Sequence, residues 1–167
     1  MGSLNPVTTF SSNILSSNYT SPNVGLFVPI ANICGDRLGF GVPVIFNIRA
    51  FLHIKNSKFM FNMRDTLHVD TSDPHVVILY YINDADGPTE IVDEGKILKR
   101  VEPKKGRLLV FDGQFEHRSN HPEKNDRCII NFNLDPIPNT KYNMIEANNT
   151  VEESNGMNIT KPQNSPK

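Results

Sequence analysis

Apolar residues occur in short runs along the middle of the chain, and turn-forming residues separate these runs. The clearest runs cover residues 44–52, 76–82, 107–111 and 127–133, and they are rich in β-branched and aromatic residues. Shorter runs at 89–92 and 97–101 flank the turn at 93–95. The runs are too short and too poorly capped for confident helices. Short strands with regularly spaced turns predict a mainly all-β fold, an antiparallel sandwich or barrel of the jelly-roll type, with few or short helices.

The two ends of the chain differ from this middle part. Residues 1–23 are rich in Ser, Asn and Thr and predict a loose N-terminal arm, with one short turn near residues 10–15. Residues 139–167 are polar and predict a disordered C-terminal tail, because such a segment buries too little apolar surface to offset its ordering entropy. We therefore expect one folded domain over residues 24–138.

Composition excludes several classes of function. The 167 residues carry a formal net charge of -1. The chain therefore lacks the excess of basic residues that would predict general nucleic-acid binding. The sequence contains no run of about 20 apolar residues, so we expect no membrane span. Residues 1–6 have neither a basic start nor an apolar stretch, so we expect no secretory signal. The two cysteines, Cys34 and Cys128, do not form a disulfide framework, and a reducing cytoplasmic location is expected.

Two short polar segments carry candidate chemistry: His68 and Asp70 form a His-x-Asp motif, and His117 follows one β-meander later. On a strand, residues two apart point to the same face, so we expect His68 and Asp70 to point together into the barrel. Two imidazoles and one carboxylate are the ligands of non-haem Fe(II) oxygenases, and they leave one side of the metal open for substrate and oxygen. Taken singly, these residues have ordinary interpretations as a surface histidine, a turn-capping carboxylate and a loop histidine. Together they predict a metal site.

Arg127 begins the last predicted strand, ten residues after His117, and shares a strand face with Ile129 and Asn131. A buried guanidinium needs a protein or ligand carboxylate, and a bidentate pair with an oxo acid would satisfy it. The alternative is an ordinary strand-end arginine in solvent. Asn131 is a candidate pocket residue. Three further histidines are expected to lie outside the site: His53, His75 and His121, the last two in loops.

Over residues 42–135 the sequence resembles the Fe(II)- and 2-oxoglutarate-dependent oxygenases, in particular the prolyl 4-hydroxylase-like branch. His68, Asp70 and His117 match the iron ligands of that family, and Arg127 matches the residue that pairs with the distal carboxylate of 2-oxoglutarate. Residues 78–83 match the strand after the first ligand pair, so Tyr81 takes the place of a tyrosine whose hydroxyl contacts the cosubstrate. Residues 106–112 match the segment before the second histidine.

One turn departs from the family pattern. Gly87-Pro88-Thr89 stands where the family usually has Gly-Gly-x-Thr, which shortens the turn and weakens any role for Thr89. The N-terminal region is also shorter than in many relatives.

The resemblance implies a double-stranded β-helix of the cupin type, with Fe(II) as cofactor, 2-oxoglutarate and O2 as cosubstrates, and ascorbate as a candidate reductant. It implies hydroxylation of a C–H bond with release of succinate and CO2. The substrate is a peptide, for example a prolyl residue, or a small molecule, because fold and cofactor do not determine it. Two alternatives remain: a non-catalytic jelly-roll binding module with a vestigial site, and a cupin-like metal enzyme that does not use 2-oxoglutarate.

Overall fold

The computed structural model of the chain describes residues 9–39, 41–55, 64–135 and 145–147. In this part of the chain, short strands predominate and there is one α-helix. The elements are β1 (Thr9–Ser16), β2 (Tyr19–Thr20), a 3-10 helix η1 (Val24–Leu26), α1 (Val28–Leu38), β3 (Ile45–His53), β4 (Val76–Tyr81), β5 (Thr89–Asp93), β6 (Lys96–Val101), β7 (Leu108–Asp112), β8 (Glu116–Ser119), β9 (Arg127–Leu134) and β10 (Ile145–Ala147).

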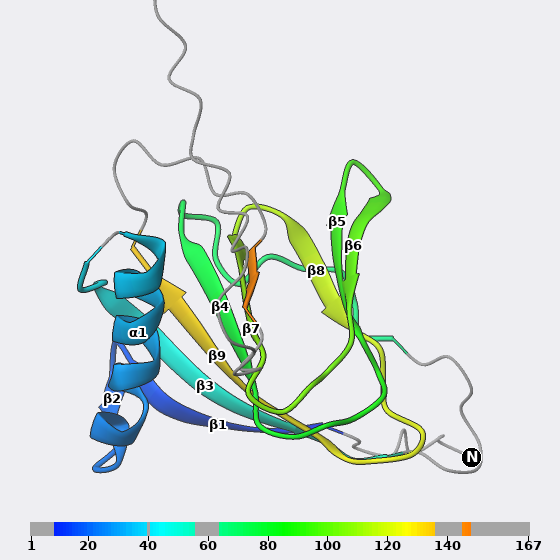
Figure 1. Ribbon diagram of the computed structural model, residues 1–167, viewed down its shortest axis with the longest axis horizontal. Helices are drawn as coiled ribbons and strands as arrows, with labels where there is room; N and C mark the ends of the chain where they lie inside the picture. The colour runs from blue at the N-terminus through cyan, green and yellow to red at the C-terminus, as the bar shows by residue number, and fades with distance from the viewer. Residues whose placement is uncertain (1–8, 40, 56–63, 136–144, 148–167) are drawn as a thin grey trace, which may run out of the picture.

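The strands form two antiparallel sheets that face each other (Figure 1). The larger sheet has the order β10-β7-β4-β9-β3-β1-β2, and the smaller has the order β6-β5-β8. Neighbours in the larger sheet are distant in sequence, since β9 lies between β3 and β4. The predicted all-β jelly-roll fold with few helices is therefore confirmed, and no described helix is long and apolar enough to cross a membrane.

The expectation of a loose arm over residues 1–23 is wrong for residues 9–16. They form β1, which pairs along its length with β3, and no short turn occurs near residues 10–15. The segment looks polar because only one of its residues, Ile14, is buried. The predicted disordered tail lies outside the described residues except for β10, which pairs with β7.

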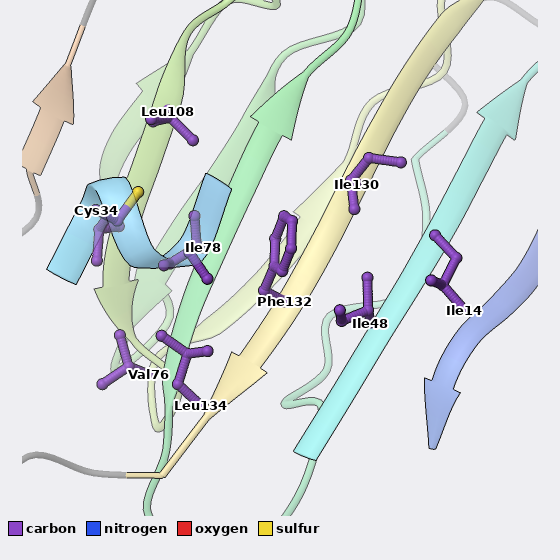
Figure 2. Close-up of a cluster of buried hydrophobic side chains, with 11 residues drawn as sticks. Ile14, Cys34, Ile48, Val76, Ile78, Leu108, Ile130, Phe132 and Leu134 are labelled. Carbon is purple, nitrogen blue, oxygen red and sulfur yellow. The ribbon is translucent and has the colours of Figure 1, made fainter. Parts of the chain in front are cut away.

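Helix α1 covers the outer face of the larger sheet (Figure 1). Pro29 lies in its first turn, where a missing N–H costs nothing, and Gly39 ends it with a φ of 76°. Ala31 and Cys34 face the sheet and pack on apolar residues of the central strands, as Figure 2 shows for Cys34. A second apolar cluster fills the space between the sheets: Val77, Leu79, Tyr81, Ile91, Val101, Leu109, Phe111 and Ile129. The two clusters thus pack on opposite faces of the larger sheet.

On the outer face of the smaller sheet, Glu90 of β5 is fully buried beneath three arginines. Arg118 donates from Nε to Glu90 Oε2 at 2.8 Å, and Arg100 and Arg64 approach to 3.4 and 3.9 Å. Burial opposes the charge of this carboxylate, but the hydrogen bond from Arg118 and the neighbouring positive charges hold the pKa of Glu90 below its usual value. This cluster joins β5, β6 and β8 to the segment that leads to His68.

Candidate metal and oxo-acid site

A segment without regular secondary structure brings His68 next to His117. Single bridges join Arg64 to Asn120 and His68 to His117, so residues 64–68 run antiparallel beside β8. The two histidines exchange backbone hydrogen bonds of 3.2 and 2.9 Å, and their rings lie 4.6 Å apart. The prediction that His68 and Asp70 lie on a regular strand is therefore wrong. They lie in an irregular segment at the edge of the smaller sheet.

The three predicted metal ligands converge on one point. One donor atom from each of His68, Asp70 and His117 lies within 4.8 Å of the others. Asp70 Oδ1 is 3.6 Å from His68 Nε2 and 3.7 Å from His117 Nε2. These two nitrogens and one carboxylate oxygen can together hold a divalent transition metal on one side of its coordination sphere.

The other polar atom of each ligand is already engaged. His68 Nδ1 lies 2.9 Å from the carbonyl of Thr66, and His117 Nδ1 lies 3.3 Å from the carbonyl of Phe115. A carbonyl only accepts, so each Nδ1 carries the proton and each Nε2 offers its lone pair toward the metal position. Asn131 Nδ2 donates to Asp70 Oδ2 at 2.8 Å, which leaves Oδ1 toward the two imidazoles.

The charges of this cluster favour metal binding. Burial opposes the ionisation of Asp70, but the neighbouring His68 and His117 side chains hold the pKa of Asp70 well below its usual range. Burial lowers the pKa of His117, which disfavours the protonated form of that imidazole. The neighbouring Asp70 carboxylate raises the pKa of His68. A metal ion would replace the proton that these groups share.

His68, Asp70 and His117 line one end of a pocket of about 200 Å³ between the two sheets. Its walls are formed by apolar side chains from β3, β4 and β9 and by polar side chains from β1, β3, β5, β8, β9 and the segment before β4. The lining residues are Thr9, Phe51, His53, Asp65, His68, Asp70, Leu79, Thr89, His117, Ser119, Ile129 and Asn131.

Arg127 lies fully buried behind the polar end of this pocket. Its NH1 donates to Ser119 Oγ at 2.9 Å and to His53 Nδ1 at 3.3 Å, and its NH2 donates to Thr89 Oγ1 at 2.7 Å. Nε has no hydrogen-bond partner in the part of the chain that the structure describes. None of the ion pairs found among the described residues includes Arg127. A buried guanidinium without a paired acid is costly, and a ligand carboxylate would relieve that cost.

Tyr81 and Asn131 lie in the same interior but have different surroundings. Tyr81 is fully buried, its hydroxyl donates to Thr89 Oγ1 at 2.8 Å, and the Arg127 guanidinium lies 5.6 Å from its ring centre. Tyr81 does not line the pocket, so its hydroxyl supports Arg127 through Thr89. Asn131 lines the pocket and contacts Asp70.

Sequence reasoning missed three residues at the polar end of the pocket. Thr89 was given little weight because of the shortened turn, yet its hydroxyl joins Tyr81 to Arg127. His53 was placed outside the site but lines the pocket. Ser119 could have been predicted, because it lies two residues after His117 on the same strand and therefore shares its face.

Comparison with known proteins supports the fold. No protein-family model and no curated protein matches the sequence. Among solved structures, the chain superposes on an oxidoreductase of the 2OG-Fe(II) oxygenase family from Burkholderia pseudomallei with a TM-score of 0.61 and 13% identity, covering 75% of this chain and 65% of that one. The chain shares the jelly-roll fold of the 2OG-Fe(II) oxygenases.

Two prolyl hydroxylases show the same likeness. The enzyme from Trichoplax adhaerens, solved with a peptide fragment of the hypoxia inducible factor oxygen degradation domain, gives a TM-score of 0.54 at 15% identity over 76% of this chain and 63% of that one. The viral collagen prolyl hydroxylase from Paramecium Bursaria Chlorella virus-1 gives 0.51 at 11% identity over 76% and 79%. The chain thus spans less than two thirds of the first two of these three proteins. At such identities the likeness establishes the fold.

Proposed function

We propose that the chain is an Fe(II)- and 2-oxoglutarate-dependent dioxygenase that hydroxylates a C–H bond. The net reaction consumes the substrate, 2-oxoglutarate and O2 and yields the hydroxylated substrate, succinate and CO2. The observation that carries the proposal is that three prepared metal donors line a pocket and a buried guanidinium lies directly behind its polar end, hydrogen-bonded to three pocket-lining residues, His53, Ser119 and Thr89. A metal site alone would not require Arg127.

The side chains divide the work between two ends of the pocket. His68, Asp70 and His117 would hold Fe(II), which supplies oxygen activation when it is bound. Arg127 would bind the distal carboxylate of the cosubstrate, and Tyr81 would hold Thr89 against it. These two roles follow from where the charged and polar groups lie.

The pocket also controls water and ligand geometry. Asn131 orients Asp70 so that one carboxylate oxygen faces the metal position. Phe51, Leu79 and Ile129 form an apolar wall between the two ends. Such a wall limits water around the bound oxo acid and strengthens its interaction with Arg127. Because two of the superposed structures are prolyl hydroxylases, a prolyl peptide is the first substrate to test.

A binding experiment tests the proposal before the substrate is known. Protein loaded with Zn(II), which does not turn over, is titrated with 2-oxoglutarate by calorimetry. We expect metal-dependent binding that His68→Ala abolishes and Arg127→Lys weakens about 100-fold, since truncating a buried charge pair costs about 2–5 kcal/mol. Arg37→Ala, at an exposed arginine of α1, is the matched control and should leave binding unchanged.

Turnover then separates the proposal from its alternatives. With Fe(II), O2 and prolyl peptides, we expect succinate to form in proportion to hydroxylated product. A protein that binds metal but no 2-oxoglutarate would be a cupin-like enzyme of another type. A protein that binds neither would be a binding module with a vestigial site.

A further inference from the structure

His53 lies directly beside the guanidinium of Arg127. The two residues are register partners on β3 and β9, and Thr9 of β1 continues the same row. The His53 side chain is 3% exposed and lines the pocket. Its Nδ1 lies 3.3 Å from Arg127 NH1, and its Nε2 lies 3.4 Å from Asp65 Oδ2.

The neighbours of His53 determine which ring nitrogen carries the proton. A guanidinium only donates, so Nδ1 must accept and the proton must be on Nε2. Asp65 accepts that proton, and its second oxygen lies 2.8 Å from His121 Nε2. Burial lowers the pKa of His53 by more than the hydrogen bond to Asp65 raises it, which agrees with a neutral ring. Asp65 thus holds His53 in the form that can accept from Arg127.

This arrangement leaves the Nε hydrogen of the guanidinium without an acceptor among the described residues. An arginine has five N–H donors in a fixed plane. His53 and Ser119 take both hydrogens of NH1, and Thr89 takes one hydrogen of NH2. In any arginine, the Nε hydrogen and one hydrogen of NH2 form the edge to which a carboxylate can bind with two hydrogen bonds.

We propose that His53 is a positioning residue for Arg127: held by Asp65, it fixes NH1 so that the Nε/NH2 edge receives the distal carboxylate of the oxo acid. The inference rests on the proposed function, because it concerns how that site distinguishes oxo acids. His53 does not touch the carboxylate itself. It acts by restricting the rotation of a buried cation that also donates hydrogen bonds to the hydroxyl groups of Ser119 and Thr89.

The test compares two oxo acids that differ in the distal group. Zn(II)-loaded protein is titrated with 2-oxoglutarate and with 2-oxopentanoate, which lacks the distal carboxylate. We expect wild type to prefer 2-oxoglutarate. His53→Phe should reduce this preference roughly 10-fold, the effect of about one hydrogen bond to a charged group, and leave 2-oxopentanoate binding unchanged. His53→Asn, which keeps an acceptor near the Nδ1 position, should retain most of the preference.

Leu52→Ala is the matched control, because Leu52 is the preceding residue of β3, points to the outer face and is 38% exposed. It should leave the preference unchanged. If wild type shows no preference, the role proposed for Arg127 is wrong. If wild type prefers 2-oxoglutarate and His53→Phe keeps that preference, or weakens both acids equally, the positioning role is wrong.

Asp65→Ala provides an independent variant in case His53→Phe does not fold. The Asp65 side chain is 33% exposed, so its substitution perturbs packing less than a change at His53. Alanine removes the acceptor that orients the ring, and the preference for 2-oxoglutarate should fall severalfold. An unchanged preference in Asp65→Ala overturns the inference.

Discussion

Replacing Asn131 with alanine tests whether the metal site depends on the orientation of its carboxylate. The Asn131 amide donates a 2.8 Å hydrogen bond to Asp70 Oδ2, and the Asp70 side chain is only 14% exposed. A hydrogen bond to a charged group contributes about 1.5–3 kcal/mol, and each 1.4 kcal/mol corresponds to about tenfold in affinity. Groups that orient metal ligands typically contribute about 10- to 100-fold to metal affinity. We therefore expect Asn131→Ala to weaken Zn(II) binding by roughly this factor.

The next inward-facing residue of β9 supplies a matched control. Asn133 is the same residue type, two positions along the strand, and is similarly buried, at 6% against 8% exposure. In the described ranges of the chain, no hydrogen bond joins its side chain to Asp70, so Asn133→Ala should leave metal affinity unchanged. Affinity is measured by competition with a chelator of known strength at constant pH. Equal affinity in both variants, or an equal loss in both, would refute the orientation argument.

Three further predictions concern stability, measured by denaturant unfolding. Glu90→Gln should cost about 2 kcal/mol, because it removes the buried charge that three arginines share. Gly113→Ala should cost about 1–3 kcal/mol, because its Cβ would lie 2.1 Å from His75 Nε2, whereas Gly25→Ala meets no atom within 4 Å and should cost less. Asp86 is partly buried, but hydrogen bonds from the backbone N–H groups of residues 123–125 hold its pKa below its usual value. The advantage of wild type over Asp86→Asn should therefore be complete above about pH 4 and disappear as the pH falls through the depressed pKa.

The fold was predictable because most of its strands appear in the sequence as short apolar runs between turn-forming residues. Residues 76–81 form a continuous apolar run, as expected for a strand with helix α1 on one side and the barrel interior on the other. β1 was missed because it is a strand near the edge of the sheet with mostly exposed side chains, so its apolar signal is weak. β1 is held in the sheet by its pairing with β3, which cannot be predicted from the composition of residues 9–16.

The candidate site was predictable where its residues are close in sequence. His68 and Asp70 were found together, and the face shared by Arg127 and Asn131 followed from strand alternation. The surroundings of Arg127 could not be derived in this way. His53 reaches it only through the register of β3 against β9, which depends on tertiary pairing between residues 74 positions apart.

Strand geometry also sets the spacing between the two ends of the pocket. His117 and Ser119 are two residues apart on β8 and share a face, so the metal end and the cation end are separated by about 7 Å at the backbone. The neighbouring segment repeats this division, since His68 serves the metal end and Asp65 the cation end. A one-residue slip in this pairing would turn His117 and Ser119 outward together. If the proposed function is correct, metal binding and cosubstrate binding depend on the same strand register, and a slip in that register would disrupt both.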